Sequence, residues 1–213
     1  MNKNEKFVIT INRELGSGGR TIGRKLAERL GVTFYDKALI QGLQKEYHLS
    51  VNEIENLKGR NHSWWADFKR SLSLGFSASQ SQYHDLAIGK KPDTLTTDEM
   101  FETEQEILRG IAEEESCVIA GRSGFYVFKD HPNRFNVLIQ APMYYRVERV
   151  MRKQNLTREQ AVETIEKVDK MRENYVNKYT KTSRYDTRNY DLVISSANHT
   201  EDQIVDIIMA FIK

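Results

Sequence analysis

The segment INRELGSGGRTIGRKL, Ile11 to Leu26, leads from a β-branched run through a glycine cluster into a helix with regularly spaced apolar residues. Gly16, Gly18 and Gly19 can adopt positive φ angles and let the backbone approach a ligand closely. Successive backbone amides at the start of the following helix favour an anion, most simply a phosphate. The segment therefore predicts a phosphate loop, residues 14–21, between a strand and a helix.

The phosphate loop departs at two positions from the pattern G-x-x-x-x-G-K-[ST]. Glu14 stands in place of the first glycine and Arg20 in place of the lysine, whereas Thr21 keeps the hydroxyl that reaches a magnesium ion. Arginine keeps the positive charge and can contact two phosphate oxygens at once. A glycine-rich connection without a ligand is the alternative, and the strand–loop–helix context favours phosphate binding over it.

Five apolar, β-branched runs predict the strands of one sheet. They are Phe7–Ile11, Thr33–Tyr35, Cys117–Ala120, Phe135–Ile139 and Asp191–Ser195. Most are continuously apolar, as in strands of a parallel sheet that is covered on both faces. Helical segments separate these runs, so the chain is expected to have an α/β fold.

Four helix starts carry a hydroxyl residue followed three positions later by Glu or Gln, the pattern of a capping box. They are Ser50…Glu53, Thr96…Glu99, Thr157…Gln160 and Thr200…Gln203. The helix after Thr157 is expected to be long, because apolar residues recur every three or four positions and should form one buried face. These residues are Ala161, Ile165, Val168, Met171 and Tyr175.

Composition narrows the class of protein. The 213 residues carry 32 basic and 30 acidic side chains, a net charge of +2, which is a weaker basic bias than nucleic-acid binding usually shows. The single cysteine, Cys117, excludes a disulfide within the chain. No apolar run approaches a membrane-spanning length, and the histidines lack metal-ligand spacing. We expect one cytoplasmic domain over residues 1–213 that binds neither nucleic acid nor membrane, and its oligomeric state stays open.

Basic residues recur after the predicted strands, where open α/β sheets bind ligands. Arg122 lies in AGRSG, directly after the third strand. Arg146 and Arg149 follow the fourth strand, and Arg152 or Lys153 continues that series. Asp169 and Arg172 stand three apart and should share a helix face. Phosphoryl transfer relies on such groups, because positive charge stabilises the transferred oxygens.

Several blocks in order resemble the cytidylate kinase-like family of P-loop proteins, relatives of bacterial cytidylate kinase. The blocks are ITINRELGSGGRTIGRKLAERLGVTFYDKALI, CVIAGRSG, DKMRENYVNKYT and NYDLVISS. The resemblance runs from about Lys6 to the C-terminus and is weakest over residues 61–92. It implies a three-layer α/β/α P-loop kinase fold with a five-stranded parallel sheet, a helical insertion and a lid.

The resemblance also implies a site. ATP phosphates would bind at Gly16, Ser17, Gly18, Gly19, Arg20 and Thr21, and Thr21 would hold Mg²⁺. Asp36 would lie near the magnesium and the acceptor, and Arg122 would clamp the acceptor phosphate. The lid would contribute Arg149, Arg172 and Arg146. Residues 49–93 would form the acceptor-binding insertion, and residues 142–185 the lid and the long helix after it.

Two departures from the family pattern leave the acceptor open. Ser123 follows Arg122, where cytidylate kinases have an aspartate that helps recognise cytosine. The segment DKMRENY holds a single arginine, whereas the lid signature of the family is rich in arginine. A kinase for a nucleoside monophosphate, with CMP or dCMP first, is the leading hypothesis. A nucleotide-binding regulatory module without turnover and a kinase for a non-nucleotide metabolite are the alternatives.

Overall fold

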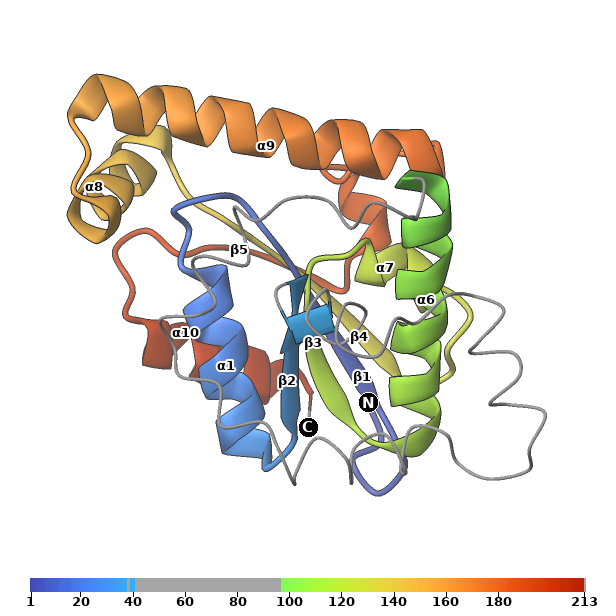
Figure 1. The fold of residues 1–213 in the computed structure, drawn as a ribbon. Coiled ribbons are helices and arrows are strands. Elements are labelled where there is room, and N and C mark those ends of the chain that lie inside the picture. Colours follow the sequence, from blue (N-terminus) through green and yellow to red (C-terminus); the bar gives the residue numbers. More distant parts are fainter. Residues whose placement is uncertain (38, 41–96, 213) are drawn as a thin grey trace, which may run out of the picture.

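The computed structural model describes residues 1–37, 39–40 and 97–212 (Figure 1). The predicted insertion, residues 49–93, and the predicted helix starts at Ser50 and Thr96 lie outside this part of the chain. A five-stranded parallel sheet has the strand order β2-β3-β1-β4-β5. Its strands are β1 (Val8–Arg13), β2 (Thr33–Asp36), β3 (Cys117–Ala120), β4 (Arg134–Gln140) and β5 (Leu192–Ser195). All five predicted strands are therefore confirmed.

Helices cover both faces of the sheet (Figure 1). On one face lie α6 (Thr97–Glu114) and the short α7 (Gly124–Val127), and on the other lie α1 (Gly19–Leu30) and α10 (Glu201–Phe211). Alternate residues of each inner strand serve the two faces, so Cys117 packs with α6 while Val118 packs with α1 and α10. This arrangement confirms the expected three-layer α/β/α fold.

Two capping boxes fix helix starts as predicted. Thr157 and Gln160 cap α9 (Arg158–Thr180), and Thr200 and Gln203 cap α10, each pair with reciprocal side-chain to backbone hydrogen bonds. Because each box satisfies two amides that lack partners within the helix, both helices start where these residues stand.

Helix α9 and the preceding α8 (Met143–Gln154) form a separate pair that extends across one end of the sheet (Figure 1). Ala161 and Ile165 of α9 are buried against Val147 and Val150 of α8, as the apolar period predicts. Met171 does not continue this buried face and is 53% exposed, because α9 has passed α8 at that point and borders a cavity. The prediction of one buried stripe along the whole helix was wrong there.

Strand β5 is only partly buried, although the apolar run predicted cover on both faces. It pairs with β4 alone and is therefore an edge strand. None of the helices in the described ranges combines the length and apolar character needed to cross a membrane.

Candidate active site

The phosphate loop connects β1, the central strand, to α1. Gly16 and Gly18 have φ angles of +86° and +82°, which favour glycine. A Cβ on Gly16 would lie 2.7 Å from the carbonyl oxygen of Arg146, so the close approach of α8 also requires glycine. Glu14 turns toward α8, and its Oε2 accepts a hydrogen bond from the Ala141 amide at 2.9 Å. Glu14 thus anchors the loop where the standard pattern has glycine.

A cavity of about 610 Å³, the loop cavity, lies against the phosphate loop and the start of α1. Its lining contains seven basic side chains and two carboxylates: Arg13, Arg20, Arg24, Lys37, Arg149, Lys153 and Arg172, with Glu14 and Asp36. Such an excess of positive charge beside a helix N-terminus favours a polyanion. Thr21, which the sequence predicts to bind magnesium, also lines the loop cavity.

Arg20 and Asp36, which are 16 positions apart in the sequence, meet at this cavity. The Arg20 Nε donates to Asp36 Oδ2 at 2.7 Å, and the carboxylate is buried while the arginine side chain is 47% exposed. Asp36 Oδ1 also accepts from the Leu39 amide at 3.1 Å. Two predicted site residues are therefore brought together, with the arginine reaching toward solvent and the aspartate held in place.

Arg149 lies on the other side of the phosphate loop. A Cβ on Gly18 would lie 3.2 Å from the Arg149 Cζ, so the guanidinium packs against the loop backbone. Its Nη2 donates to Glu201 Oε1 at 2.7 Å, and this hydrogen bond lowers the pKa of Glu201. The pair joins α8 to the start of α10.

Arg122 lies in a tight turn at the carboxyl end of β3. Gly121, Arg122 and Ser123 all have positive φ angles, a conformation that costs energy for non-glycine residues and occurs often at functional sites. The Arg122 guanidinium contacts Glu104 of α6 and donates to the Tyr175 hydroxyl at 2.9 Å. Burial lowers the pKa of Arg122. The turn therefore places a buried cation where the sequence predicts an acceptor contact.

A second cavity of about 480 Å³, the turn cavity, lies between this turn and α9. Five cations line it, and no carboxylate does so among the described residues. The cations are Arg13, Lys37, Arg122, Arg172 and Arg184. Arg13, Lys37 and Arg172 also line the loop cavity, so these three residues mark the junction between the two cavities.

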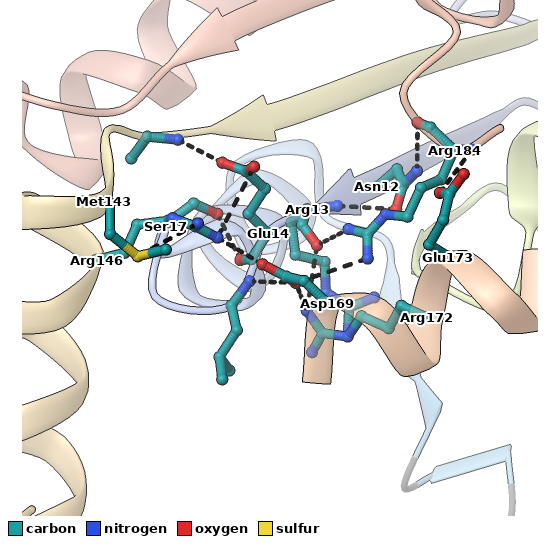
Figure 2. Close-up of polar contacts among 12 residues, drawn as sticks. Asn12, Arg13, Glu14, Ser17, Met143, Arg146, Asp169, Arg172, Glu173 and Arg184 are labelled. Atoms are coloured by element: carbon teal, nitrogen blue, oxygen red, sulfur yellow. Dashed lines mark hydrogen bonds and ion pairs between the residues drawn. The ribbon is translucent and has the colours of Figure 1, made fainter. Parts of the chain in front are cut away.

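Asp169, in the middle of α9, is the centre of a polar cluster that reaches the phosphate loop (Figure 2). Its Oδ1 accepts from the Leu15 amide at 3.0 Å, and its Oδ2 accepts from Arg146 Nη1 at 2.5 Å. The Nη1 atoms of Arg172 and Arg184 lie 3.5 and 3.7 Å from Oδ1. One carboxylate thus contacts the loop backbone and three arginines from α8, α9 and the segment after α9.

The sequence-based prediction of the site missed Arg13, Lys37 and Arg184, which line these cavities, and Glu104, which contacts Arg122. Arg13 and Lys37 are direct neighbours of predicted elements, since Arg13 precedes the phosphate loop and Lys37 follows Asp36. Glu104 and Arg184 have no local sequence signal, because only packing brings α6 and the segment after α9 to the site. No group of three or more His, Cys, Asp or Glu residues in the described ranges is arranged to hold a metal ion.

The sheet order and the phosphate loop define the three-layer α/β/α fold of the P-loop kinases. A gluconokinase from Sinorhizobium meliloti 1021 has the same fold, with a TM-score of 0.52 at 13% identity over 97% of this chain and 91% of that chain. An uncharacterized protein from Eubacterium ventriosum ATCC 27560 is more similar, with a TM-score of 0.68 at 25% identity over 97% and 98% of the two chains.

The chain belongs to the cytidylate kinase-like family, whose model matches residues 8–198. A cytidylate kinase from Methanosarcina barkeri is 26% identical over 205 residues, which cover 94% of this chain and 93% of that protein. A protein from Corynebacterium glutamicum named uronate isomerase is 30% identical over 142 residues, 66% of this chain. That match spans only 26% of the relative's length. Family and fold support a nucleotide-binding function of the kinase type.

Proposed function

We propose that the protein transfers the γ-phosphoryl group of ATP to a small acceptor that already carries a phosphate, a nucleoside monophosphate such as CMP or dCMP. The loop cavity would hold the ATP phosphates and the turn cavity the acceptor. The observation that supports a phosphorylated acceptor is the lining of the turn cavity, with five cations and no carboxylate among the described residues. Glu104 and Asp169 compensate part of this charge, since they contact Arg122, Arg172 and Arg184, and an anionic acceptor would compensate more of it.

The residues of the chain would act mainly through position and charge. Gly16, Ser17, Gly18 and Gly19 would offer backbone amides to the ATP phosphates, and Arg20 and Thr21 would complete that contact. When bound, Mg²⁺ would neutralise charge on the phosphate oxygens, and the Thr21 hydroxyl and Asp36 fit its preference for oxygen ligands.

Lid and acceptor residues would complete the site. Arg149 and Arg172 line the loop cavity from α8 and α9 and would contact the phosphates when residues 142–185 act as a lid. Arg122 would hold the acceptor phosphate. The predicted acceptor insertion, residues 49–93, would contribute further contacts.

The experiment that tests this function measures ADP formation from ATP and Mg²⁺ with each of a panel of nucleoside monophosphates, together with thermal-shift binding of ATP. Turnover with one monophosphate well above the background without acceptor is the expected result. Stabilisation by ATP without turnover of any monophosphate would instead favour the regulatory module or a non-nucleotide acceptor.

Arg122→Ala is expected to raise KM for the acceptor by about 10- to 100-fold while changing KM for ATP little, because a hydrogen bond to a charged phosphate contributes about 1.5–3 kcal/mol. Steady-state kinetics with each substrate varied in turn provides the measurement. The change leaves the buried Glu104 without its cation. Arg122→Met combined with Glu104→Gln is therefore the control, because it removes both charges of the pair together. Equal losses for both substrates, or none, would contradict this role for Arg122.

A further inference from the structure

Arg13, the last residue of β1, has a side chain that two glycines accommodate. A Cβ on Gly19 would lie 2.5 Å from the Arg13 Cβ and 3.0 Å from its Cγ. A Cβ on Gly121, in the turn after β3, would collide with the Arg13 Nη1. The side chain therefore runs from the start of α1 to the turn that carries Arg122. A larger residue at position 19 would occupy the space that the Arg13 side chain fills.

Arg13 also lies at the junction of the two cavities, because it lines both of them. Its backbone is fixed there: the main-chain carbonyl accepts hydrogen bonds from Arg172 Nη1 at 3.2 Å and from Arg184 Nη2 (Figure 2). A group held by the central strand and by two further arginines is well placed for a role that requires a fixed geometry.

The charge of Arg13 is less compensated than that of the arginines identified from the sequence. Arg20 pairs with Asp36, Arg149 with Glu201 and Arg122 with Glu104. Within the described residues, the Arg13 guanidinium has no hydrogen-bond acceptor or ion-pair partner in contact, and the Asp36 carboxylate acts on it only at longer range, where it raises the Arg13 pKa. Removal from water and the neighbouring Arg172 lower the pKa of Arg13 to about 9. A cation in such surroundings gains stability when an anion binds beside it.

We propose that Arg13 is a catalytic residue, whose guanidinium contacts the phosphoryl group as it passes between the two cavities. This assignment rests on the function proposed above. In the transfer, an oxygen of the acceptor phosphate forms a bond to the γ-phosphorus. The bond from that phosphorus to the bridging oxygen breaks, and its electron pair leaves on ADP. No proton moves, because the acceptor phosphate is already ionised. Arg13 stabilises the charge on the transferred oxygens, as a loop lysine does in the standard pattern.

Arg13→Gln tests the assignment against Arg29→Gln, which removes an arginine near the end of α1 that is 49% exposed and pairs with the exposed Asp206 of α10. Arg13→Gln is expected to lower kcat by about 100- to 1,000-fold, with a much smaller change in KM for ATP, because the contact is strongest in the transition state. Arg29→Gln should retain the kcat of the unmodified protein. If Arg13→Gln keeps the folded circular dichroism spectrum and a kcat within about threefold of the unmodified protein, the assignment is overturned.

A relocated charge separates the role of the cation from a merely structural role. Gly19→Lys alone should be inactive, because its side chain enters space that Arg13 occupies. Combined with Arg13→Gly, the same lysine has room and should recover turnover relative to Arg13→Gly alone. A double variant no more active than Arg13→Gly would indicate that catalysis does not depend on a positive charge at this place, which contradicts the assignment of Arg13.

Binding of ADP, Mg²⁺ and aluminium fluoride, a mimic of the transferred phosphoryl group, gives a readout that does not depend on turnover. Calorimetry should show that fluoroaluminate strengthens ADP binding to the unmodified protein and to Arg29→Gln, but not to Arg13→Gln. Equal strengthening in all three proteins overturns the assignment of Arg13. Failure of the proposed function would look different, as an unmodified protein that turns over no acceptor in the panel.

Discussion

Asp169→Ala is expected to lower the free energy of unfolding by about 3–5 kcal/mol, because it removes the carboxylate that compensates buried arginines. Arg146 is 8% exposed and Arg184 is fully buried, and both have a guanidinium nitrogen within 4 Å of this carboxylate. The variant also removes the acceptor of the Leu15 amide in the phosphate loop, so the protein should lose turnover as well as stability. Urea denaturation followed by circular dichroism measures the effect.

Glu166→Ala is the matched control for Asp169→Ala, because it removes an exposed carboxylate from the same helix. Its effect on the free energy of unfolding is expected to stay within about 0.5 kcal/mol. Asp169→Asn keeps the shape and an oxygen for the Leu15 amide but loses the charge, so it separates electrostatic compensation from hydrogen bonding. A loss below about 1 kcal/mol for Asp169→Ala would show that the cluster does not stabilise the fold as inferred.

Arg20→Ala is expected to lower turnover by about 100- to 1,000-fold and leave the fold intact, because it removes a cation from the phosphate loop. The side chain is 47% exposed, so its loss leaves no cavity in the core. It also removes a partner of Asp36, whose carboxylate the Leu39 amide still contacts. Turnover is measured with the acceptor identified in the monophosphate panel, and folding by thermal denaturation.

Arg20→Lys and Arg29→Ala complete the Arg20 series. Lysine keeps the charge without the planar fork, so partial activity would indicate that charge dominates, whereas full loss would indicate contact with two phosphate oxygens. Arg29→Ala removes an exposed arginine of α1 and should behave like the unmodified protein. Unchanged turnover in Arg20→Ala would remove Arg20 from the mechanism and leave Arg13 as the principal cation of the junction.

Local patterns in the sequence predicted most of the fold. The five strands were identified from short β-branched runs, and the capping boxes at Thr157 and Thr200 from residue types three positions apart. Such signals depend only on residues that are close in the sequence, so they can be recognised without knowledge of the packing. The spacing of apolar residues along α9 did not predict the exposure of Met171. That exposure arises because α8 packs against the first part of α9 only, around Ala161 and Ile165.

The site was predicted in part. The glycines of the phosphate loop have the positive φ angles expected at Gly16 and Gly18, and Arg20 and Asp36 meet at the loop cavity. The roles of these residues in binding and catalysis stay predictions. Arg122 was identified from its place after a strand, but its contact with Glu104 was not, since that glutamate lies on a helix with no site signal.

The sequence by itself determined the α/β order, the phosphate loop and the family, because each depends on residue types at fixed short spacings. Only the tertiary structure decided that Asp169 joins three arginines to the loop, and that Arg13 reaches between Gly19 and Gly121 to line both cavities. These arrangements join residues up to 171 positions apart, as between Arg13 and Arg184. Compensation of buried charge holds the Asp169 cluster, and the space left by two glycines admits the Arg13 side chain; both depend on packed elements that no short stretch of sequence contains.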